Sequence, residues 1–364
     1  MAYNYVELGS LITPSKTVRC GDGVYPVLSM TMHNGLVFQD EKFKKVIASK
    51  DTSDYKVVYR NQLVISFPID EGVLAAQRIT DAGIVSPAYG IWDINQSKIL
   101  PEFLEYALRC DRAIQYYKAK LRGSTARRRT IPTPTLLAFM VPLPCLEEQK
   151  MVIDRIHRAR LVIENRKEQM NKLDDLIKAR FVELFGDPIS NSKNLETKSL
   201  NEIMILKAGD FTAASAISDT LTETHRYPCY GGNGIRGFVA EYNQEGEYSL
   251  IGRQGALSGN VQYAKGRFKN TEHALLVTPK IQMNSIWLNQ LLRNLELKRF
   301  QTGAAQPGLS VKNLQDIPII TVSIEKQNRF ADFVAKIDKS KAVIQKSLEE
   351  AQLLFDSLMQ QYFG

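Results

Sequence analysis

The residues best suited to chemistry in this sequence are basic side chains grouped in one short loop. Arg127, Arg128 and Arg129 are consecutive, and Lys120 and Arg122 come just before them. Cations at this density suit the phosphates of a nucleic acid backbone. The alternative is a solvated loop that binds nothing. We favour phosphate contact, because a related loop with basic residues occurs at the matching place in the second half of the chain.

In the second half, the polar candidates fall in glycine-containing loops near residues 233, 255 and 300. Arginine makes paired hydrogen bonds to guanine, and asparagine or glutamine makes them to adenine. The glycines are better suited to shaping turns than to binding. Each polar side chain either points at DNA or packs locally, and the sequence leaves both alternatives open. The candidate DNA-contacting residues here are Asn233, Arg236, Arg253, Gln254, Asn260, Arg299, Gln301, Gln306 and Lys312.

Residues 232–237 read G-N-G-I-R-G and match the glycine pattern of dinucleotide-binding sites. Such a site needs a strand before the glycines and a crossover helix after them. Only the short run FVAEY follows before another polar turn, and the matching place in the first half lacks the glycines. A tight turn between two short strands is the better interpretation.

Residue types that build metal sites and active sites are scattered. The four cysteines lie far apart without a C-x-x-C pair, which disfavours a zinc site and is typical of a reducing cytoplasm. His33, His157, His225 and His273 show no metal-ligand spacing. The sequence contains no Walker A loop, no nuclease carboxylate set, and no Pro-Pro-Tyr or Pro-Pro-Phe motif of amino-methyltransferases. We therefore expect no catalytic residue, no metal and no cofactor bound by this chain.

Length and charge narrow the class of protein. A chain of 364 residues predicts two or three domains. The 47 Lys and Arg residues outnumber the 39 Asp and Glu residues, which gives a net charge of +8 and a pI near 9.1. This balance favours an anionic partner such as nucleic acid. The first residues, MAYNYVELGS, carry no signal pattern, and no apolar run is long enough for a membrane span, so we expect a cytoplasmic protein.

Two long helices must position these loops. Residues 147–186 align without a gap on residues 325–364 after a shift of 178 positions. Apolar residues recur about every 3.5 positions in both copies, which is typical of a coiled-coil seam and would give a rod of roughly 57 Å. The same series places Leu184 in the seam. The main predicted seam residues are Ile156, Ile163, Met170, Leu173, Ile177, Val334, Ile337, Ile344, Leu348 and Phe355.

The repeat extends beyond these helices. Tyr25-Pro26 and Tyr227-Pro228 open segments of matching spacing, and residues 103–108 resemble residues 287–292. The second helix must return antiparallel to bury its seam on the first. We therefore expect the two globular halves at opposite ends of the rod, related by a pseudo-twofold axis.

Runs of β-branched and aromatic residues predict that both halves are mixed α/β, with more strand than helix. The first half should hold a strand pair, a further strand and one helix. The second half should hold three strands and one helix. In chain order, these expected elements are residues 55–67, 83–94, 101–120, 248–251, 260–264, 273–278 and 285–300.

Taken together, these features resemble the specificity subunit of type I restriction–modification enzymes. The most specific carriers are VPLPCLEEQKMVIDRI…LDDLIKARFVELFGD and DIPIITVSIEKQNRFADFVAKID…LFDSLMQQYFG, with YPCYGGNGIRGFVAEY and SLIGRQGALSGNVQYAKGRFKNTEHALLV beside them. The second copy departs from the first in having Glu325-Lys326-Gln327 where the first has Glu147-Glu148-Gln149. That departure would make the two docking surfaces for partner proteins unequal.

The resemblance implies a non-catalytic subunit whose two target-recognition domains each read one half of a split, asymmetric DNA sequence. The helices would set the spacing between the halves and dock two methyltransferase subunits, and motor–nuclease restriction subunits would join that core. The methyltransferase would use S-adenosylmethionine, and the motor would use ATP and Mg. None of these cofactors is expected to bind this chain.

The predicted fold class is α+β, with two mixed α/β target-recognition domains separated by a long antiparallel two-helix coiled coil, an internal tandem duplication with pseudo-twofold symmetry. The predicted domains are 1–144, 145–186, 187–322 and 323–364. Two alternatives from other classes are a stand-alone DNA methyltransferase or nuclease and a coiled-coil scaffold that binds only protein. The missing catalytic motifs disfavour the first, and the basic loops disfavour the second.

Overall fold

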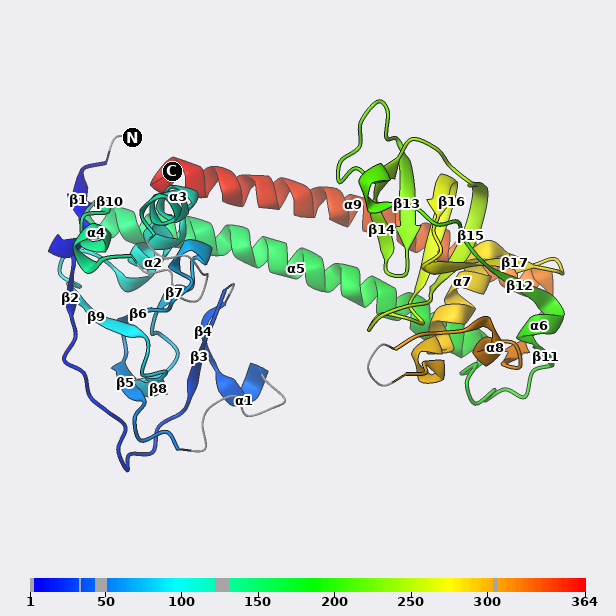
Figure 1. Ribbon diagram of the computed structural model, residues 1–364, viewed down its shortest axis with the longest axis horizontal. Coiled ribbons are helices and arrows are strands. Elements are labelled where there is room, and N and C mark those ends of the chain that lie inside the picture. The colour runs from blue at the N-terminus through cyan, green and yellow to red at the C-terminus, as the bar shows by residue number, and fades with distance from the viewer. Residues whose placement is uncertain (1–2, 33, 43–50, 122–130, 304–306) are drawn as a thin grey trace. The chain divides into compact units, whose positions relative to one another are not determined.

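The computed structural model describes residues 3–32, 34–42, 51–121, 131–303 and 307–364 (Figure 1). It divides into two compact units. Unit 1 comprises Met1–Arg166 and Ser347–Gly364, and unit 2 comprises Lys167–Lys346. The division passes through both long helices, α5 (Leu146–Phe185) and α9 (Ile324–Phe363), each 40 residues long. Each unit therefore combines one globular region with a piece of each long helix.

The globular region of unit 1 is built from short antiparallel pairings. Its four-stranded sheet has the order β2-β9-β6-β7, and β1-β10, β3-β4 and β5-β8 form separate pairs. The elements are β1 (Tyr5–Glu7), η1 (Leu8–Ser10), β2 (Ile12–Pro14), β3 (Leu28–Thr31), β4 (Gly35–Phe38), α1 (Gln39–Lys42), β5 (Lys56–Tyr59), β6 (Leu63–Ile65), η2 (Ile69–Glu71), β7 (Leu74–Ala76), β8 (Ala82–Val85), β9 (Gly90–Ile94), α2 (Pro101–Arg109), α3 (Asp111–Lys120), α4 (Thr133–Leu137) and β10 (Met140–Pro142).

The globular region of unit 2 has a larger sheet. Its six strands follow the order β12-β17-β15-β16-β13-β14, and β11 pairs with β18 separately. Only the β13–β16 pairing in this sheet is parallel among the described strands. The elements are β11 (Thr197–Ser199), α6 (Leu200–Ile203), β12 (Met204–Ala208), η4 (Ala214–Ala216), β13 (Tyr227–Gly231), β14 (Gly234–Val239), β15 (Gln244–Gly252), β16 (Val261–Asn270), β17 (Ala274–Pro279), α7 (Ser285–Asn294), η5 (Leu297–Phe300), α8 (Val311–Leu314) and β18 (Pro318–Ile320).

The mixed helix and strand content expected from the sequence is confirmed. Several predicted elements, however, are interrupted in the structure. The helix expected over 101–120 breaks at Cys110, whose backbone is extended (φ −69°, ψ 161°) because this residue caps the N-terminus of α3. The helix expected over 285–300 breaks where Glu296 adopts a left-handed φ of 50°. The expected strand over 83–94 is two strands, β8 and β9.

The expected strand pair over 55–67 is also wrong in its pairing. This segment does form two strands, but β5 pairs with β8, whereas β6 pairs with β7 and β9. Short-range sequence signals find strands, yet they cannot choose among partners when a longer-range pairing buries more apolar surface.

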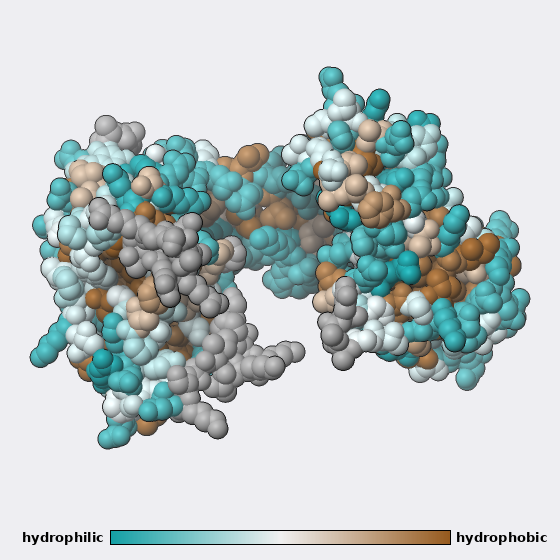
Figure 2. Space-filling view, in the orientation of Figure 1, coloured by the Kyte–Doolittle hydropathy of each residue, from teal (hydrophilic) through white to brown (hydrophobic). Residues whose placement is uncertain are grey.

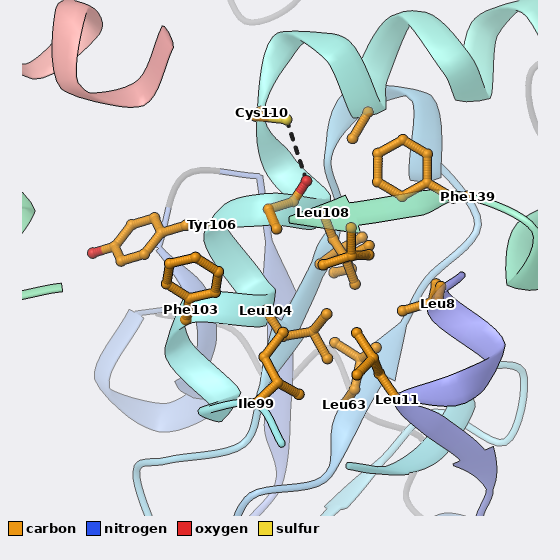
Figure 3. Packing of buried hydrophobic residues seen from close by; sticks show 14 of the residues in the cluster. Leu8, Leu11, Leu63, Ile99, Phe103, Leu104, Tyr106, Leu108, Cys110 and Phe139 are labelled. Carbon is orange, nitrogen blue, oxygen red and sulfur yellow. Dashed lines mark hydrogen bonds between the residues drawn. The ribbon is translucent and has the colours of Figure 1, made fainter. Parts of the chain in front are cut away.

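Each unit has a core that includes apolar residues from both long helices. In unit 1, leucine and aromatic side chains of η1, β6 and α2 converge (Figure 3), joined by Val152 and Ile156 of α5 and Phe363 of α9. In unit 2, Trp287 of α7 packs with Phe181 of α5 and Phe330 of α9. The long helices are therefore structural parts of both cores.

Inside each unit the two long helices run antiparallel. In unit 1, Arg155 Nη1 donates to the Tyr362 hydroxyl at 2.5 Å, and Arg166 Nε donates to Ser347 Oγ at 3.0 Å. Ascending numbers on α5 therefore meet descending numbers on α9. In unit 2 the same order holds, since Asp174 pairs with Lys341 and the Phe181 and Phe330 rings lie 5.4 Å apart.

The residues predicted for the seam differ in how deeply they are buried. Leu184 is 38% exposed, whereas Phe181 and Phe185 are buried. The last turn of α5 packs against Trp287, so the buried stripe there follows the globular core rather than the heptad series. The buried seam residues are Ile156, Ile163, Ile177 and Val334, and the half-buried ones are Met170, Leu173, Ile337, Ile344, Leu348 and Phe355.

The first turn of each long helix carries a buried glutamine with the same role. Gln149 Oε1 accepts from the N–H of Leu100, the residue that precedes α2, at 2.7 Å. Gln327 Oε1 accepts from the N–H of Asn284, the residue that precedes α7, at 2.8 Å. Each glutamine also donates to the backbone carbonyl five residues before it, at 2.9 Å for Gln149 and 3.0 Å for Gln327.

Candidate nucleic-acid interface

Four loops of unit 2 meet at one end of the six-stranded sheet. We call this end the loop edge and define it as residues 209–212, 231–234, 252–260 and 270–274. Strand register brings them together, because Ala208 pairs with Leu275, Gly252 pairs with Ala274, and Tyr230 pairs with Asn270. Loops far apart in sequence therefore share one surface.

Backbone hydrogen bonds tie these loops to one another and to residues 307–309. Arg253 N–H donates to His273 O at 2.9 Å, and Leu309 N–H donates to Arg253 O at 2.7 Å. Gly252 and Gly232 approach so closely that a Cβ on Gly252 would lie 2.1 Å from Gly232 O. Glycine is required there by lack of space, which accords with a turn-shaping role. The result is a rigid base for polar side chains.

Two of the predicted amides are brought together. Asn260 Nδ2 donates to Asn233 Oδ1 at 2.9 Å, which joins the loop after β15 to the turn after β13. This bond leaves acceptor capacity on Asn260 and donor capacity on Asn233, the complement of an adenine edge. Gln254 is exposed, and its Oε1 lies 2.8 Å from His273 Nδ1.

Other predicted residues serve the loops themselves. Gln301 Nε2 donates to Ser258 O at 2.5 Å, so this amide holds the loop edge in place. Arg253 is half-buried, and its Nη1 donates to Glu272 O at 3.2 Å. Both therefore have a structural role. Arg236 is exposed on β14, and its carbon chain covers Gly231.

A basic hollow lies beside Asn260. It has a volume of about 510 Å³ and is lined by residues 259–262, 293 and 296–299. Arg293, Lys298 and Arg299 are exposed around it, and the Arg299 guanidinium stacks over the Phe300 ring at 4.7 Å. Three cations against the single carboxylate of Glu296 suit an anion. Sequence reasoning did not single out Arg293, which stands alone in the last turn of α7 without a basic cluster to signal it.

The remaining candidates are separate or undescribed. Lys120 is exposed at the end of α3, and Lys312 is exposed on α8. Arg122, Arg127, Arg128, Arg129 and Gln306 lie outside the described residues.

Unit 1 has a corresponding sheet end with different side chains. Ile65 pairs with both Gly90 and Leu74, so the loops 66–73 and 86–89 meet there. Phe67 is 46% exposed in the first of these loops. Unit 1 also has a charged network along α2, in which Glu105 pairs with Arg109 at 3.0 Å, and Arg78 pairs with Glu102 at 2.7 Å. The network reaches α5, since His157 Nε2 lies 2.6 Å from Glu102 Oε1.

Metal ligands and groups with shifted pKa values are a further kind of candidate site. No three His, Cys, Asp or Glu side chains among the described residues group in a way that could hold a metal ion. Strongly raised pKa values belong to buried tyrosines, and burial raises the pKa of Tyr106 and of Tyr263 to about 12. The Tyr263 hydroxyl lies 2.8 Å from Ser285 Oγ and donates to Glu247 at 2.7 Å. Among the described helices, none has the length and apolar character needed to span a bilayer.

The fold and the loop edge define a protein with two mixed α/β modules on a frame of long helices, with amide and basic side chains presented on rigid loops. Residues 192–353 match the family model described as the type I restriction modification DNA specificity domain. The second half of the chain is therefore similar to that domain, and the resemblance predicted from the sequence is confirmed.

Two curated relatives are specificity subunits. The chain is 45% identical over 141 residues to the EcoprrI type I restriction enzyme specificity subunit of Escherichia coli. This aligned stretch covers 39% of this chain and 35% of the relative. It is 29% identical over 138 residues to a putative type I specificity subunit of Haemophilus influenzae, which covers 37% of this chain and 35% of the relative. The matches thus span about a third of each relative's length.

Solved structures share the fold over the whole chain. The S subunit of a type I restriction–modification system from M. genitalium has a TM-score of 0.59 at 17% identity, covering 100% of this chain and 96% of that one. A chain from a structural study of type I complex assembly and conformational transition has a TM-score of 0.56 at 16% identity, covering 99% and 97%. At this identity the likeness concerns the fold alone.

Proposed function

We propose that this chain is the DNA-reading subunit of a type I restriction–modification complex and has no catalytic role of its own. The observation that carries the proposal is the loop edge of unit 2, which lies within the matched specificity domain. There an asparagine pair suited to a base edge adjoins a hollow ringed by three cations. Base contacts would supply specificity, and phosphate contacts would supply most of the affinity.

We also propose that the two globular regions are target-recognition domains that each read one half of a split, asymmetric site. The long helices would form an antiparallel coiled coil that fixes the gap between the half-sites. The repeated glutamine contacts of Gln149 and Gln327 support a tandem duplication. So do the helix ends, since Phe363 packs on Phe103 at 4.9 Å and Phe185 packs on Trp287 at 5.9 Å. A duplicated frame with different loops would read two different sequences.

The partners in this proposal are double-stranded DNA, two methyltransferase subunits and, in a cleaving complex, restriction subunits, all in the cytoplasm. The methyltransferase would supply S-adenosylmethionine chemistry, and the motor would use ATP and Mg. Exposed apolar residues on the long helices, visible as brown patches in Figure 2, suit protein docking. Leu176 and Leu354, at matching positions of the repeat, are 45% and 54% exposed and are our candidate docking residues.

The proposal is tested by mapping methylated adenines across the source genome with and without this gene. Loss of methylation at one split motif on deletion is the expected result, and complementation should restore it. A variant with both Leu176 and Leu354 changed to Asp should fail to complement, whereas the same change at the exposed surface residue Leu221 should not matter. If purified complex containing the intact chain binds no DNA sequence selectively, the proposal is wrong.

A further inference from the structure

Phe211 stands out on the loop edge of unit 2. It follows β12 directly after Gly209 and Asp210, and its side chain is 78% exposed. No other aromatic side chain among the described residues is exposed to that extent. Single exposed apolar residues are common on protein surfaces, so exposure alone carries no argument. The argument rests on how the neighbours of Phe211 are held.

The backbone on both sides of Phe211 is fixed to the turn after β16. Asp210 N–H donates to Asn270 O at 3.1 Å, and Glu272 N–H donates to Asp210 O at 3.2 Å. On the other side, Thr212 N–H donates to the Glu272 carboxylate at 3.2 Å. A Cβ on Gly209 would lie 2.1 Å from Asn270 O, so the strand end presses directly on this turn.

Side chains reinforce the same support. The Asp210 carboxylate accepts from Asn243 Nδ2 at 2.8 Å and pairs with Lys269 Nζ at 3.4 Å. These contacts, the Asn243 hydrogen bond first, hold the pKa of Asp210 below its usual value, so the carboxylate stays charged at neutral pH. Asn243 is itself anchored, because its Oδ1 accepts from Asn270 N–H at 2.7 Å. The residues flanking Phe211 are thus immobilised while the ring itself remains in solvent.

An exposed aromatic ring on a held backbone, in the same loop edge as the candidate base-reading amides, has a specific use in a DNA groove. Thymine differs from the other bases by a 5-methyl group in the major groove, and apolar side chains recognise it by contact. The amides and arginines of the loop edge cannot read that methyl group. Because the backbone that carries the ring is already held, the contact costs little backbone conformational freedom on binding, which favours it.

We propose that Phe211 is a specificity-determining residue that packs on the 5-methyl group of a thymine in the half-site read by unit 2. This inference rests on the proposed function, since it needs that unit to face DNA. Unit 1 has no described counterpart with the same support, so the contact would belong to one half-site only.

The test uses the full chain in complex with its methyltransferase subunits and the target motif found by methylation mapping. Synthetic duplexes carry uracil in place of one thymine at a time, which removes only the methyl group. The intact complex should bind roughly tenfold more weakly to the duplex altered at one position of one half-site. The Phe211→Ala complex should bind that duplex and the unaltered one equally. Ile205→Ala is the matched control, because Ile205 is 50% exposed near the start of β12, away from the end that Phe211 follows.

Phe211→Ala should keep the thermal midpoint of the intact chain, because the ring is mostly exposed. Equal binding of the intact complex to every uracil duplex would overturn the inference and leave the proposed function standing. So would a Phe211→Ala complex that still discriminates thymine from uracil at the sensitive position. An intact complex that binds no sequence selectively would overturn both the inference and the proposed function.

Discussion

Units 1 and 2 share the contacts that join their long helices to a shorter helix. They differ in the side chains that their loops expose. In both, a buried glutamine at the start of a long helix accepts a hydrogen bond from the backbone N–H of the residue that precedes a shorter helix, α2 or α7. In both, the closing phenylalanine of the other long helix packs on the aromatic residue of that shorter helix. These are the contacts that position one element on another.

The sheet ends differ in chemistry. Unit 2 presents a bonded asparagine pair and a basic hollow, whereas unit 1 presents the exposed ring of Phe67. Unit 1 also has a four-stranded sheet with its β3–β4 hairpin separate, whereas the corresponding β13–β14 hairpin of unit 2 joins the main sheet. A common frame therefore tolerates large changes at the surface, as expected if the loops and not the frame carry specificity.

The largest expected effects come from breaking the shared aromatic contacts. Phe103→Ala and Trp287→Ala each remove a fully buried ring and should each destabilise the protein by about 3–5 kcal/mol. Hydrogen exchange should show the loss of protection in unit 1 for the first variant and in unit 2 for the second. Phe103→Leu, which keeps much of the volume, should cost less. Loss of protection in the opposite unit would contradict the assignment of these rings to separate cores.

A smaller effect should follow from removing the glutamines. Gln149→Ala and Gln327→Ala leave buried backbone groups without partners, at a cost of about 1–3 kcal/mol each. Gln149→Ala should lower the stability more than Gln327→Ala, because the Gln149 amide also donates to Lys98 O at 3.0 Å. Urea unfolding monitored by circular dichroism measures the difference, with exposed Gln352→Ala as the control. Identical, negligible changes in both variants would show that the glutamines do not stabilise the frame.

The loops should respond without loss of stability. Asn260→Ala breaks the asparagine pair and should relax one base position of a single half-site, with about tenfold weaker discrimination there. Methylation sequencing of cells that carry the variant gene reads both half-sites at once. Asn61→Gly breaks an amide contact of equal length in unit 1, to Gln96 at 2.9 Å, and should leave the motif unchanged; glycine is used because Asn61 has a left-handed φ of 69°. Relaxation in both half-sites would argue against separate reading by the two units.

The smallest change is expected at the basic hollow. Arg293→Ala or Lys298→Ala should weaken DNA binding similarly for all sequences and lower the slope of log affinity against log salt by about one. Binding measured across a salt series by the assembled complex tests this. Lys339→Ala, an exposed lysine on α9, gives the comparison. An unchanged slope for both hollow variants would place the hollow away from the phosphates.

The sequence predicted the frame better than the site. The two helices were located to within a residue or two, because a repeated apolar period reports burial directly. Leu184 was misplaced because a tertiary contact, the packing of Phe181 and Phe185 on Trp287, overrode the period. The sequence predicted one helix across Cys110, because nothing near this residue in the sequence signals the end of α2 and the start of α3.

The site was harder to predict, because the type of a residue does not reveal where its side chain points. Arg253 and Gln301 have the right chemistry for base contact, yet their side chains bond to Glu272 O and Ser258 O. Phe211 carries no motif, and strand register places its loop at the loop edge. Arg293 carries no motif either, and it lines the basic hollow from the last turn of α7. Long-range register is the information that a single sequence lacks.

The order of elements in the two units also has a consequence for synthesis on the ribosome. Unit 2 is one continuous stretch, Lys167–Lys346, whereas unit 1 needs Ser347–Gly364 to complete its core. Phe363 must reach Phe103, and its carbonyl must reach Arg112 Nε at 3.0 Å. The module translated first is therefore the one whose folding finishes last, and a nascent chain halted before residue 347 would leave that core open to chaperones and proteases.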